Sequence, residues 1–445
     1  MLATGRTSRW AAGIAAALAL VLAFPTGALA APGDLGFVRT ISYNVPGAVH
    51  IGPVNPLDWA SAATTRPNGD TVYVVAGGDG GSGTAVPAIS SFRRAADDTL
   101  TLSGCMGELT GCRPTSVADL YAASAVVAAG SHVYVATPSE VAAFRTTASG
   151  GLDTDFCVWD PGCGGVAALP GLASWSTSDH ALTTSADGRD LYLYASGSGR
   201  GAVYHLRRDG GTGRLAFHGC IGEAMPGCTP IGRTGVLTSS GDAVLSADGR
   251  SLYVVARNPG SVTHFRRDLA TGSLAEVGCI SETGTGGCNV PATHGLYRVT
   301  RGAITPAGDS LYVAGAGGVT HLRRNTVNGD LAYHGCIGYA TGCRGDGPRG
   351  TYVDVVVSPD GAGVYGSAQG PSFAWGAATH LRRSPNGDLT YAGCAGEGLP
   401  ALCREIGPTG VMNHAGPLLA PGSRVLYSLG VHWRGALTQF ARQVS

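Results

Sequence analysis

The side chains best suited to chemistry are polar residues at one position of a repeated sequence unit. Asp242, Arg301 and Asp354 occupy this position in three consecutive repeats. An arginine can hold a carboxylate or an oxyanion through its fork of N–H donors, and a neighbouring carboxylate can activate water. His180 lies one position earlier in the preceding repeat and is another candidate base. These four residues form the candidate catalytic group.

A structural role is the alternative for the same charged cluster. Opposite charges can neutralise one another where strands converge, without binding any ligand. The other four repeats carry small residues at this position: Ala62, Ala123, Ala181 and Gly416. The sequence therefore leaves two interpretations open, a polar pocket and a structural plug.

Five further residues are candidates for ligand binding. Asp179, Tyr352 and His414 lie two positions before the column that holds the charged residues. Trp375 and Trp433 lie in glycine-containing loops, where an exposed indole ring can stack on a sugar or contact a partner protein. The alternative for these two rings is that they cover nearby disulfides.

The composition excludes several other kinds of site. The sequence contains no Lys, which excludes a Schiff base and a Walker-type phosphate loop. Lys+Arg and Asp+Glu number 30 each, so the charge gives no reason to expect a nucleic-acid partner. Neither Gly-x-Ser-x-Gly nor His-Glu-x-x-His occurs, and none of the seven Glu residues falls in the two columns above. We therefore expect no metal and no cofactor.

Seven copies of the repeated unit predict the fold. Each copy is marked by a central tyrosine: Tyr73, Tyr134, Tyr192, Tyr253, Tyr312, Tyr365 and Tyr427. The copy around Tyr253 has four stretches rich in β-branched and aromatic residues, at 242–246, 251–257, 261–267 and 273–279, with turn signals between them. Four strands per unit and seven units predict an all-β, seven-bladed β-propeller.

The two ends of the chain are predicted to share one blade. The seventh copy ends at Ser445 after its third strand, and residues 33–43 match the fourth-strand region at residues 329–339. An N-terminal strand in this place completes blade seven and leaves no open sheet edge. Residues 31–445 are then expected to form a single propeller domain.

The repeated unit resembles the YVTN-type repeat of the seven-bladed lactonase family, which includes 6-phosphogluconolactonase-like enzymes. The resemblance is carried by SADGRSLYVVARNPGSVTHFRRD (residues 246–268) and SPDGAGVY (residues 358–365), and it extends over residues 33–445. It implies the propeller fold and a lactone hydrolase, although the repeat marks strands and turns rather than a site. Family members often have Pro-His before the first strand; here His180 matches the histidine and Asp179 replaces the proline.

Twelve cysteines fall into six pairs, each following the fourth strand of a blade. The pairs are Cys105 with Cys112, Cys157 with Cys163, Cys220 with Cys228, Cys279 with Cys288, Cys336 with Cys343, and Cys394 with Cys403. Their repetition favours a local disulfide in each pair, and the intervals are too long for Cys-x-x-Cys metal or redox motifs. Disulfides depart from the pattern of the intracellular lactonases, which puts a phosphorylated sugar lactone in doubt as the substrate.

Repeated histidines and arginines are predicted to have structural roles. His205, His264, His321 and His380 share one column of the third strand, and His218 and His334 share a column before a cysteine. Both columns are predicted to be packing positions. The repeated Arg-Arg pairs, such as Arg266-Arg267, are predicted to face solvent at the blade edges.

The first 30 residues are predicted to be a secretory signal peptide. Arg6 and Arg9 precede an apolar run over residues 11–24, and residues 28–30 form a small-x-small cleavage site. The run is shorter than the roughly 20 apolar residues that a membrane span needs. We expect a secreted, monomeric protein with no membrane span after removal of the signal.

Two functions from different classes fit these observations. The first is a secreted binding or scaffold propeller that recognises a carbohydrate, a peptide or an envelope component on its loop face. The second is a metal-independent hydrolase of a lactone or related cyclic ester, with its site at the mouth of the central channel. The expected partner is an extracellular small molecule, a glycan or a protein.

Overall fold

The computed structural model of the chain describes residues 34–42, 45–51, 56–77, 86–117, 120–138, 140–159, 169–170, 180–197, 199–239, 241–399, 401–406, 412, 415–422, 424–430 and 435–443. The predicted signal peptide at residues 1–30 lies outside these residues. Within the described ranges, no helix combines the length and the apolar character needed to span a bilayer.

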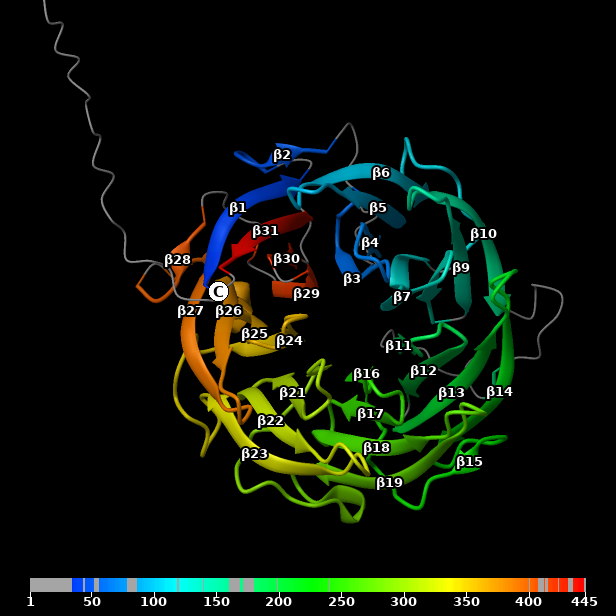
Figure 1. Cartoon of the computed structure of the whole chain (residues 1–445), viewed down its shortest axis with the longest axis vertical. Coiled ribbons are helices and arrows are strands. Elements are labelled where there is room, and N and C mark those ends of the chain that lie inside the picture. The colour runs from blue at the N-terminus through cyan, green and yellow to red at the C-terminus, as the bar shows by residue number, and fades with distance from the viewer. Residues whose placement is uncertain are drawn as a thin grey trace, which may run out of the picture. The chain divides into compact units, whose positions relative to one another are not determined.

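Seven sheets, each with four main antiparallel strands, are arranged in a ring and confirm the predicted seven-bladed propeller (Figure 1). The first strand of each blade is innermost: β3 (Ala60–Thr65), β7 (Ala125–Ala129), β11 (His180–Thr184), β16 (Gly241–Leu245), β20 (Arg301–Ile304), β24 (Thr351–Val357) and β29 (Ala415–Gly422). The second strands are β4 (Thr71–Ala76), β8 (His132–Ala136), β12 (Asp190–Gly197), β17 (Ser251–Ala256), β21 (Ser310–Gly315), β25 (Gly363–Gln369) and β30 (Val425–Gly430). These second strands carry the seven repeated tyrosines, all of them buried.

The outer half of each blade consists of the third and fourth strands. The third strands are β5 (Ala88–Arg94), β9 (Val141–Thr146), β13 (Arg200–Arg208), β18 (Ser261–Arg267), β22 (Gly318–Arg324), β26 (Gly376–Arg383) and β31 (Ala436–Arg442). The fourth strands are β6 (Leu100–Gly107), β10 (Leu152–Trp159), β14 (Leu215–Gly222), β19 (Leu274–Ser281), β23 (Leu331–Gly338), β27 (Leu389–Glu397) and β1 (Leu35–Ser42). Short strands β15 (Thr229–Pro230), β28 (Arg404–Glu405) and β2 (Val49–His50) pair in parallel with β14, β27 and β1. Three 3₁₀ turns, η1 (Leu120–Ala122), η4 (Thr285–Gly287) and η5 (Pro371–Phe373), lie in the described loops.

The ring is closed between the two ends of the chain, as predicted. Strand β1 pairs antiparallel with β31, from Leu35 opposite Arg442 to Ser42 opposite Ala436. Thr40, which replaces the cysteine of the other blades, lies opposite Thr438, and their Oγ1 atoms are 3.2 Å apart. The N-terminal strand therefore covers the edge that the last blade would otherwise expose.

A hydrogen-bonded latch joins each blade to its neighbour through the repeated tyrosine. The hydroxyl of Tyr253 donates to the carbonyl of Gly329 in the next blade at 2.6 Å and accepts from Arg324 Nε at 2.7 Å. Arg324 also forms an ion pair with Asp248 at 2.9 Å. Equivalent Arg–Tyr hydrogen bonds join Arg208 to Tyr134, Arg267 to Tyr192, Arg383 to Tyr312 and Arg442 to Tyr365.

This latch corrects the prediction that both arginines of each pair face solvent. Arg323 is exposed, whereas Arg324, the next residue, is buried between two blades. Successive side chains of a strand point to opposite faces, so two adjacent arginines cannot share one environment. The first arginine of the pair is solvated and the second joins the blades.

The repeated histidines of the third strand are buried beside the same tyrosines. His264 stacks on Tyr253 with ring centroids 5.0 Å apart, and His321 stacks on Tyr312 at 4.9 Å. Burial lowers the pKa of His264, His321 and His380 to about 4, so these imidazoles are neutral at pH 7. Packing against the tyrosine is therefore a role that these histidines share.

Five of the six predicted disulfides lie among the described side chains. They join Cys105 to Cys112, Cys220 to Cys228, Cys279 to Cys288, Cys336 to Cys343 and Cys394 to Cys403. Each described bridge closes a loop after a fourth strand, as the repeat predicts.

The sixth predicted disulfide, between Cys157 and Cys163, stays a prediction. Cys157 belongs to β10, where its backbone pairs with Ala142 of β9. Cys163 lies outside the described residues. The structure therefore neither confirms nor contradicts a bridge between these two cysteines.

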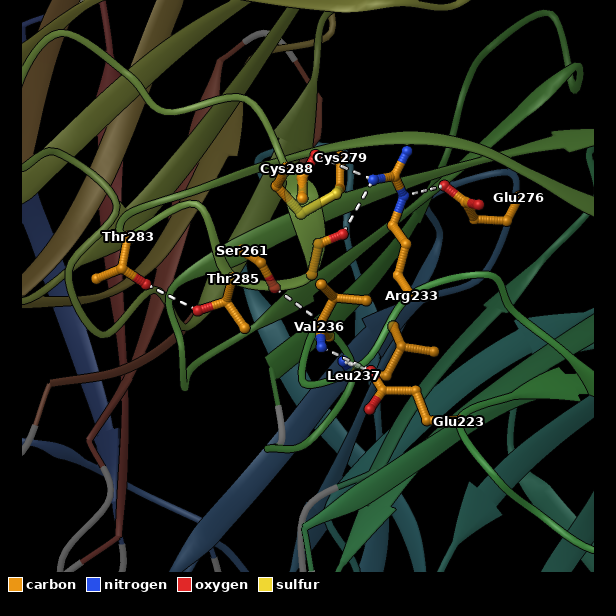
Figure 2. The surroundings of a disulfide bond; sticks show 12 residues. Glu223, Arg233, Val236, Leu237, Ser261, Glu276, Cys279, Thr283, Thr285 and Cys288 are labelled. Carbon is orange, nitrogen blue, oxygen red and sulfur yellow. Dashed lines mark hydrogen bonds and ion pairs between the residues drawn. A yellow bond between two sulfur atoms is a disulfide. The ribbon is translucent and has the colours of Figure 1, made fainter.

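Figure 2 shows how the loop around Cys279 and Cys288 is held. Arg233, from the preceding connection, donates to the carbonyls of Gly286 and Gly287, both at 3.1 Å, and forms an ion pair with Glu276 at 2.8 Å. The disulfide loop and the connection between blades three and four therefore stabilise each other.

Candidate functional site

All seven innermost strands contribute to one cavity of about 410 Å³ along the axis of the ring. Asp242, Arg301 and Asp354 line it together, so the structure brings the three charged residues of the predicted column to a single site. The rest of the wall is small or apolar and includes Ala62, Ala125, Leu182, Pro417 and Leu418. A volume of this size falls in the range of small-molecule sites, roughly 300–1,000 Å³.

Asp242 is the partner of Arg301 across the boundary between blades four and five. Arg301 Nη1 lies 3.6 Å from Asp242 Oδ1, and the two side chains are 29% and 18% exposed. Asp242 Oδ2 also accepts the backbone N–H of Gly302 at 3.0 Å. The guanidinium group is therefore positioned by a carboxylate while it remains accessible from the cavity.

Asp354 is the buried member of the cluster, with 9% of its surface exposed. Its Oδ2 accepts the backbone N–H of Leu418 at 2.7 Å, and its Oδ1 accepts that of Val355 at 2.8 Å. Burial raises the pKa of Asp354 to about 6, although the positive charge of Arg301 and the Leu418 N–H oppose this shift. A pKa in this range suits a carboxyl group that acts as a general acid or base near neutral pH.

The same carboxylates also fasten neighbouring blades to each other. Asp242 binds a backbone N–H of blade five, and Asp354 binds one of blade seven. Hydroxyl groups one residue before this column also join neighbouring blades: Ser61 Oγ donates to the carbonyl of Ala123 at 2.6 Å, and Thr300 Oγ1 to that of Tyr352 at 3.2 Å. The structural role and the cavity-facing role therefore coexist, and each acidic side chain serves both.

His180 is placed behind the cavity wall rather than on it. Its side chain is buried, and its Nδ1 lies 3.2 Å from Ser124 Oγ, while its backbone N–H donates to the same oxygen at 2.9 Å. Ser124 lines the cavity and His180 is not among the lining residues. The predicted base therefore reaches the cavity through a serine hydroxyl that sequence analysis did not single out.

The candidate ligand-binding residues that the structure describes lie away from the channel. Tyr352 and Trp375 are 2% and 8% exposed and belong to one hydrophobic cluster with Val319 and Ala368. The register of β24 shifts between Tyr352 and Asp354, so a β-bulge separates the tyrosine from the cavity-lining aspartate. Asp179, His414 and Trp433 lie outside the described residues.

Two positions of the predicted lining column are displaced. At Gly416 the register of β29 is irregular, and Pro417 lines the cavity instead. At Ala123 the count is wrong by two residues. Counting back from Tyr134 gives Ala123, but Ala125 pairs with Ala136 where Asp242 pairs with Val255. The turn between β7 and β8 is shorter than the turn between β16 and β17, and it lacks the Ala-Asp-Gly sequence that marks the latter. That missing turn sequence is the signal that could have corrected the count.

A second pocket, of about 520 Å³, lies among the loops of blades four to six. It is lined by Glu282, His294, Tyr297 and Tyr339 among others, and both tyrosines are about half exposed, at 54% and 43%. His294 Nδ1 lies 2.8 Å from Glu282 Oε1, and Glu282 Oε2 accepts the N–H of Leu296 at 2.9 Å. The pocket therefore presents aromatic rings around a fixed polar pair, which is an arrangement suited to binding.

Solved structures of low sequence identity share this fold. A periplasmic gluconolactonase from Pseudomonas aeruginosa is similar with a TM-score of 0.52 at 19% identity, over 78% of this chain and 86% of that chain. Provisionally assigned 6-phosphogluconolactonases from Bacteroides uniformis and Bacteroides fragilis have TM-scores of 0.51 and 0.52 at 18% and 17% identity, over 76% of this chain and 84% and 83% of theirs. No protein-family model and no curated protein matches the sequence. At these identities the likeness establishes the fold alone.

Proposed function

We propose that this propeller is a lactonase-like hydrolase that opens a small cyclic ester in the channel cavity. The observation that carries the proposal is the pairing, in one cavity, of Arg301 with a carboxyl group, Asp354, whose pKa is raised to about 6. The fold is also that of proteins named as lactonases, which gives this reaction class a precedent on seven blades. Fold alone does not assign chemistry, so the site carries the argument.

The proposed reaction divides the work between these two groups. Arg301 holds the carbonyl oxygen of the ester, and the Asp354 carboxylate removes a proton from a water molecule as that water attacks the carbonyl carbon. The oxyanion of the tetrahedral intermediate is stabilised by the guanidinium group. When the ring C–O bond breaks, the leaving oxygen takes the proton from Asp354, and a hydroxy acid is released. The reaction needs only these side chains and one water molecule. Asp242 positions Arg301 in every step.

The test is hydrolysis of a panel of sugar, aliphatic and aromatic lactones, followed in a pH-stat with purified protein. Arg301→Ala and Asp354→Asn are each expected to lower kcat/KM at least 100-fold, because each removes a group that acts in the transition state. Arg323→Ala, an exposed arginine on the outer part of blade five, is the control and is expected to keep full activity. Turnover that survives both cavity substitutions would contradict the proposal.

His180→Ala separates an indirect role from a direct one. Since His180 lies behind the cavity wall and contacts Ser124, which lines the cavity, its loss is expected to change the rate less than the loss of Arg301. An effect as large as that of Arg301→Ala would instead make the Ser124–His180 pair the site of chemistry.

Ligand binding on the loop face is a second candidate function, and the aromatic pocket at Tyr297 and Tyr339 favours it. Exposed aromatic rings beside a polar pair are typical of sites that stack on a sugar or grip a peptide. A glycan array is the test, with Tyr297→Ala and Tyr339→Ala as the variants. Binding that both substitutions abolish supports this function, and binding that persists in both contradicts this location.

The proposed setting is an extracytoplasmic, oxidising compartment. Five local disulfides are typical of proteins that mature outside the cytosol. Secretion through the N-terminal signal and a monomeric state complete the proposal. Its expected substrate or partner is therefore an extracellular molecule, rather than a phosphorylated intermediate of the cytosol.

A further inference from the structure

Three side chains of the types that can ligate a metal ion meet at the outer boundary between blades five and six. They are His321 on β22, His334 on β23 and Asp388, which lies just before β27, and their ligand atoms all lie within 4.8 Å of one another. His334 Nε2 is already 3.0 Å from Asp388 Oδ1. The two histidines belong to blade five, whereas the aspartate belongs to blade six.

His321 supplies an independent sign that this cluster binds something. Its ring is 2% exposed, and neither ring nitrogen has a hydrogen-bond partner among the described residues. His321 also lines a pocket of about 210 Å³ that Asp388 and Arg344 line with it. A buried imidazole with no partner costs free energy that a ligand bound to its nitrogen would recover.

The repeats show that packing alone does not produce this combination. In blade three, His205 and His218 face Ser273 in place of an aspartate, and His205 Nε2 bonds Asp190 at 2.8 Å instead.

Blade four has the histidine and the aspartate, His264 and Asp330, but Val277 in place of the second histidine. There, His264 Nε2 has a partner, Ser251 Oγ, at 3.0 Å. Blade six likewise combines His380 and Asp34 with Ala392. Among the four blades that carry the third-strand histidine, all three donors coincide only at the boundary of blades five and six.

We propose that His321, His334 and Asp388 bind one divalent transition-metal ion, with Zn²⁺ the best fit. Two imidazoles and one carboxylate suit Zn²⁺, Co²⁺ or Ni²⁺ better than Ca²⁺ or Mg²⁺, which prefer oxygen ligands alone. Donors around a tetrahedral zinc ion lie about 3.3 Å apart at bond lengths of about 2.0–2.1 Å. The three donors now lie within 4.8 Å of one another, and Asp388 is exposed, so its side chain is free to rotate towards the two imidazoles.

The ion would clamp blade five to blade six on the outside of the ring. Arg344, the cation in the same pocket, is engaged by the Leu389 carbonyl and by Asp346 at 3.3 Å, so its charge is partly neutralised. His334 and Asp388 are both solvent-accessible, which leaves an open path and further coordination positions for water. The site is separate from the channel cavity and does not depend on the proposed hydrolysis.

Isothermal titration of tag-free, metal-stripped mature protein with Zn²⁺ tests the site. One ion per chain is expected, and His334→Ala and Asp388→Ala are each expected to weaken its binding at least tenfold. The matched controls are His218→Ala and Asp330→Ala, which change the same repeat positions at boundaries that lack one donor, and both are expected to bind as the wild type does. Co²⁺ serves as a second probe, since the intensity of its visible absorption reports the number and geometry of its ligands.

A second measurement compares the Tm of each protein in EDTA with its Tm in Zn²⁺. Because the comparison is made within one protein, it remains valid for a variant that is less stable than the wild type. Zn²⁺ is expected to raise the Tm of the wild type and of both controls, but not that of His334→Ala or of the milder His334→Gln. The absence of Zn²⁺ binding by the wild type would overturn the proposal. Binding that persists in both His334 variants, or that is lost in His218→Ala, would overturn it as well.

Discussion

The backbone N–H of Leu418 donates a hydrogen bond to Oδ2 of Asp354 at 2.7 Å, across the boundary between blades six and seven. Two blades away, Gly302 makes the same kind of bond to Asp242 at 3.0 Å. Arg301 lies in the blade between these two carboxylates, and all three side chains line one cavity. The two carboxylates of the charged cluster are therefore held by hydrogen bonds between adjacent blades.

The raised pKa of Asp354 makes stability depend on pH in a defined direction. Its folded-state value of about 6 exceeds the ordinary value of 3.8, so the folded protein binds this proton more tightly than the unfolded chain does. The resulting stabilisation is complete below the unfolded pKa and is lost as the pH rises through the folded one. Two pKa units correspond to about 3 kcal/mol.

Asp354→Asn tests this dependence because its amide oxygen can still accept the Leu418 N–H. Between pH 4 and pH 7 the wild type is expected to lose up to about 3 kcal/mol of unfolding free energy relative to the variant. Urea unfolding of both proteins at several pH values measures the difference. A difference that does not change with pH would show that the environment of Asp354 does not raise its pKa.

The latch between blades predicts opposite results for two adjacent arginines. Arg324→Ala removes hydrogen bonds to Tyr253 and Gly308 and the ion pair with Asp248, so we expect a loss of roughly 2–4 kcal/mol. Arg323→Ala changes an exposed side chain and is expected to stay within about 0.5 kcal/mol of the wild type. Equilibrium urea unfolding compares them, and equal effects would contradict the assigned roles.

The disulfide between Cys279 and Cys288 is predicted to have a modest, local effect on stability. It closes a ring over a sequence separation of 9, which corresponds to roughly 2–3 kcal/mol in the chain-entropy model. The double variant Cys279→Ser, Cys288→Ser is expected to lose that amount and to fold, because Arg233 still binds the loop carbonyls (Figure 2). A double variant that fails to fold would show that the bridge is needed to form the blade.

The sequence was sufficient to predict the propeller because the repeat carries its own turn signals. The four strands predicted around Tyr253 agree with β16, β17, β18 and β19, and no strand end differs by more than two residues. Strand β1 was predictable for the same reason, since residues 33–43 repeat a fourth strand. In both cases strands and turns are local, and ring closure only brings equivalent units together.

The site was predictable only where the strands keep a regular register. Counting back from the tyrosines placed Asp242, Arg301 and Asp354 together, and the structure brings them into one cavity. The count failed at Ala123 because the turn between β7 and β8 is short, and at Gly416 because the register of β29 is irregular. Tyr352 was expected near the ligand, but a bulge turns β24 between it and Asp354, and nothing in the sequence marks that bulge.

The meeting of His321, His334 and Asp388 could not be read from the histidine columns alone. The sequence predicts a packing role for each histidine column, and the aspartate comes from the following blade. Only the positions of neighbouring blades show that the three columns converge, and at which boundary all of them carry a donor. Relationships of this kind depend on tertiary structure.

The pH dependence of lactone hydrolysis by wild-type protein and Asp354→Asn tests the central claim most directly. If Asp354 acts as the base, kcat/KM of the wild type is expected to rise with pH and to level off above a midpoint near 6, the raised pKa of this group. Asp354→Asn is expected to lose both the activity and this midpoint. A midpoint near 6 that persists in the variant, or wild-type protein that hydrolyses no lactone in the panel, would contradict the account.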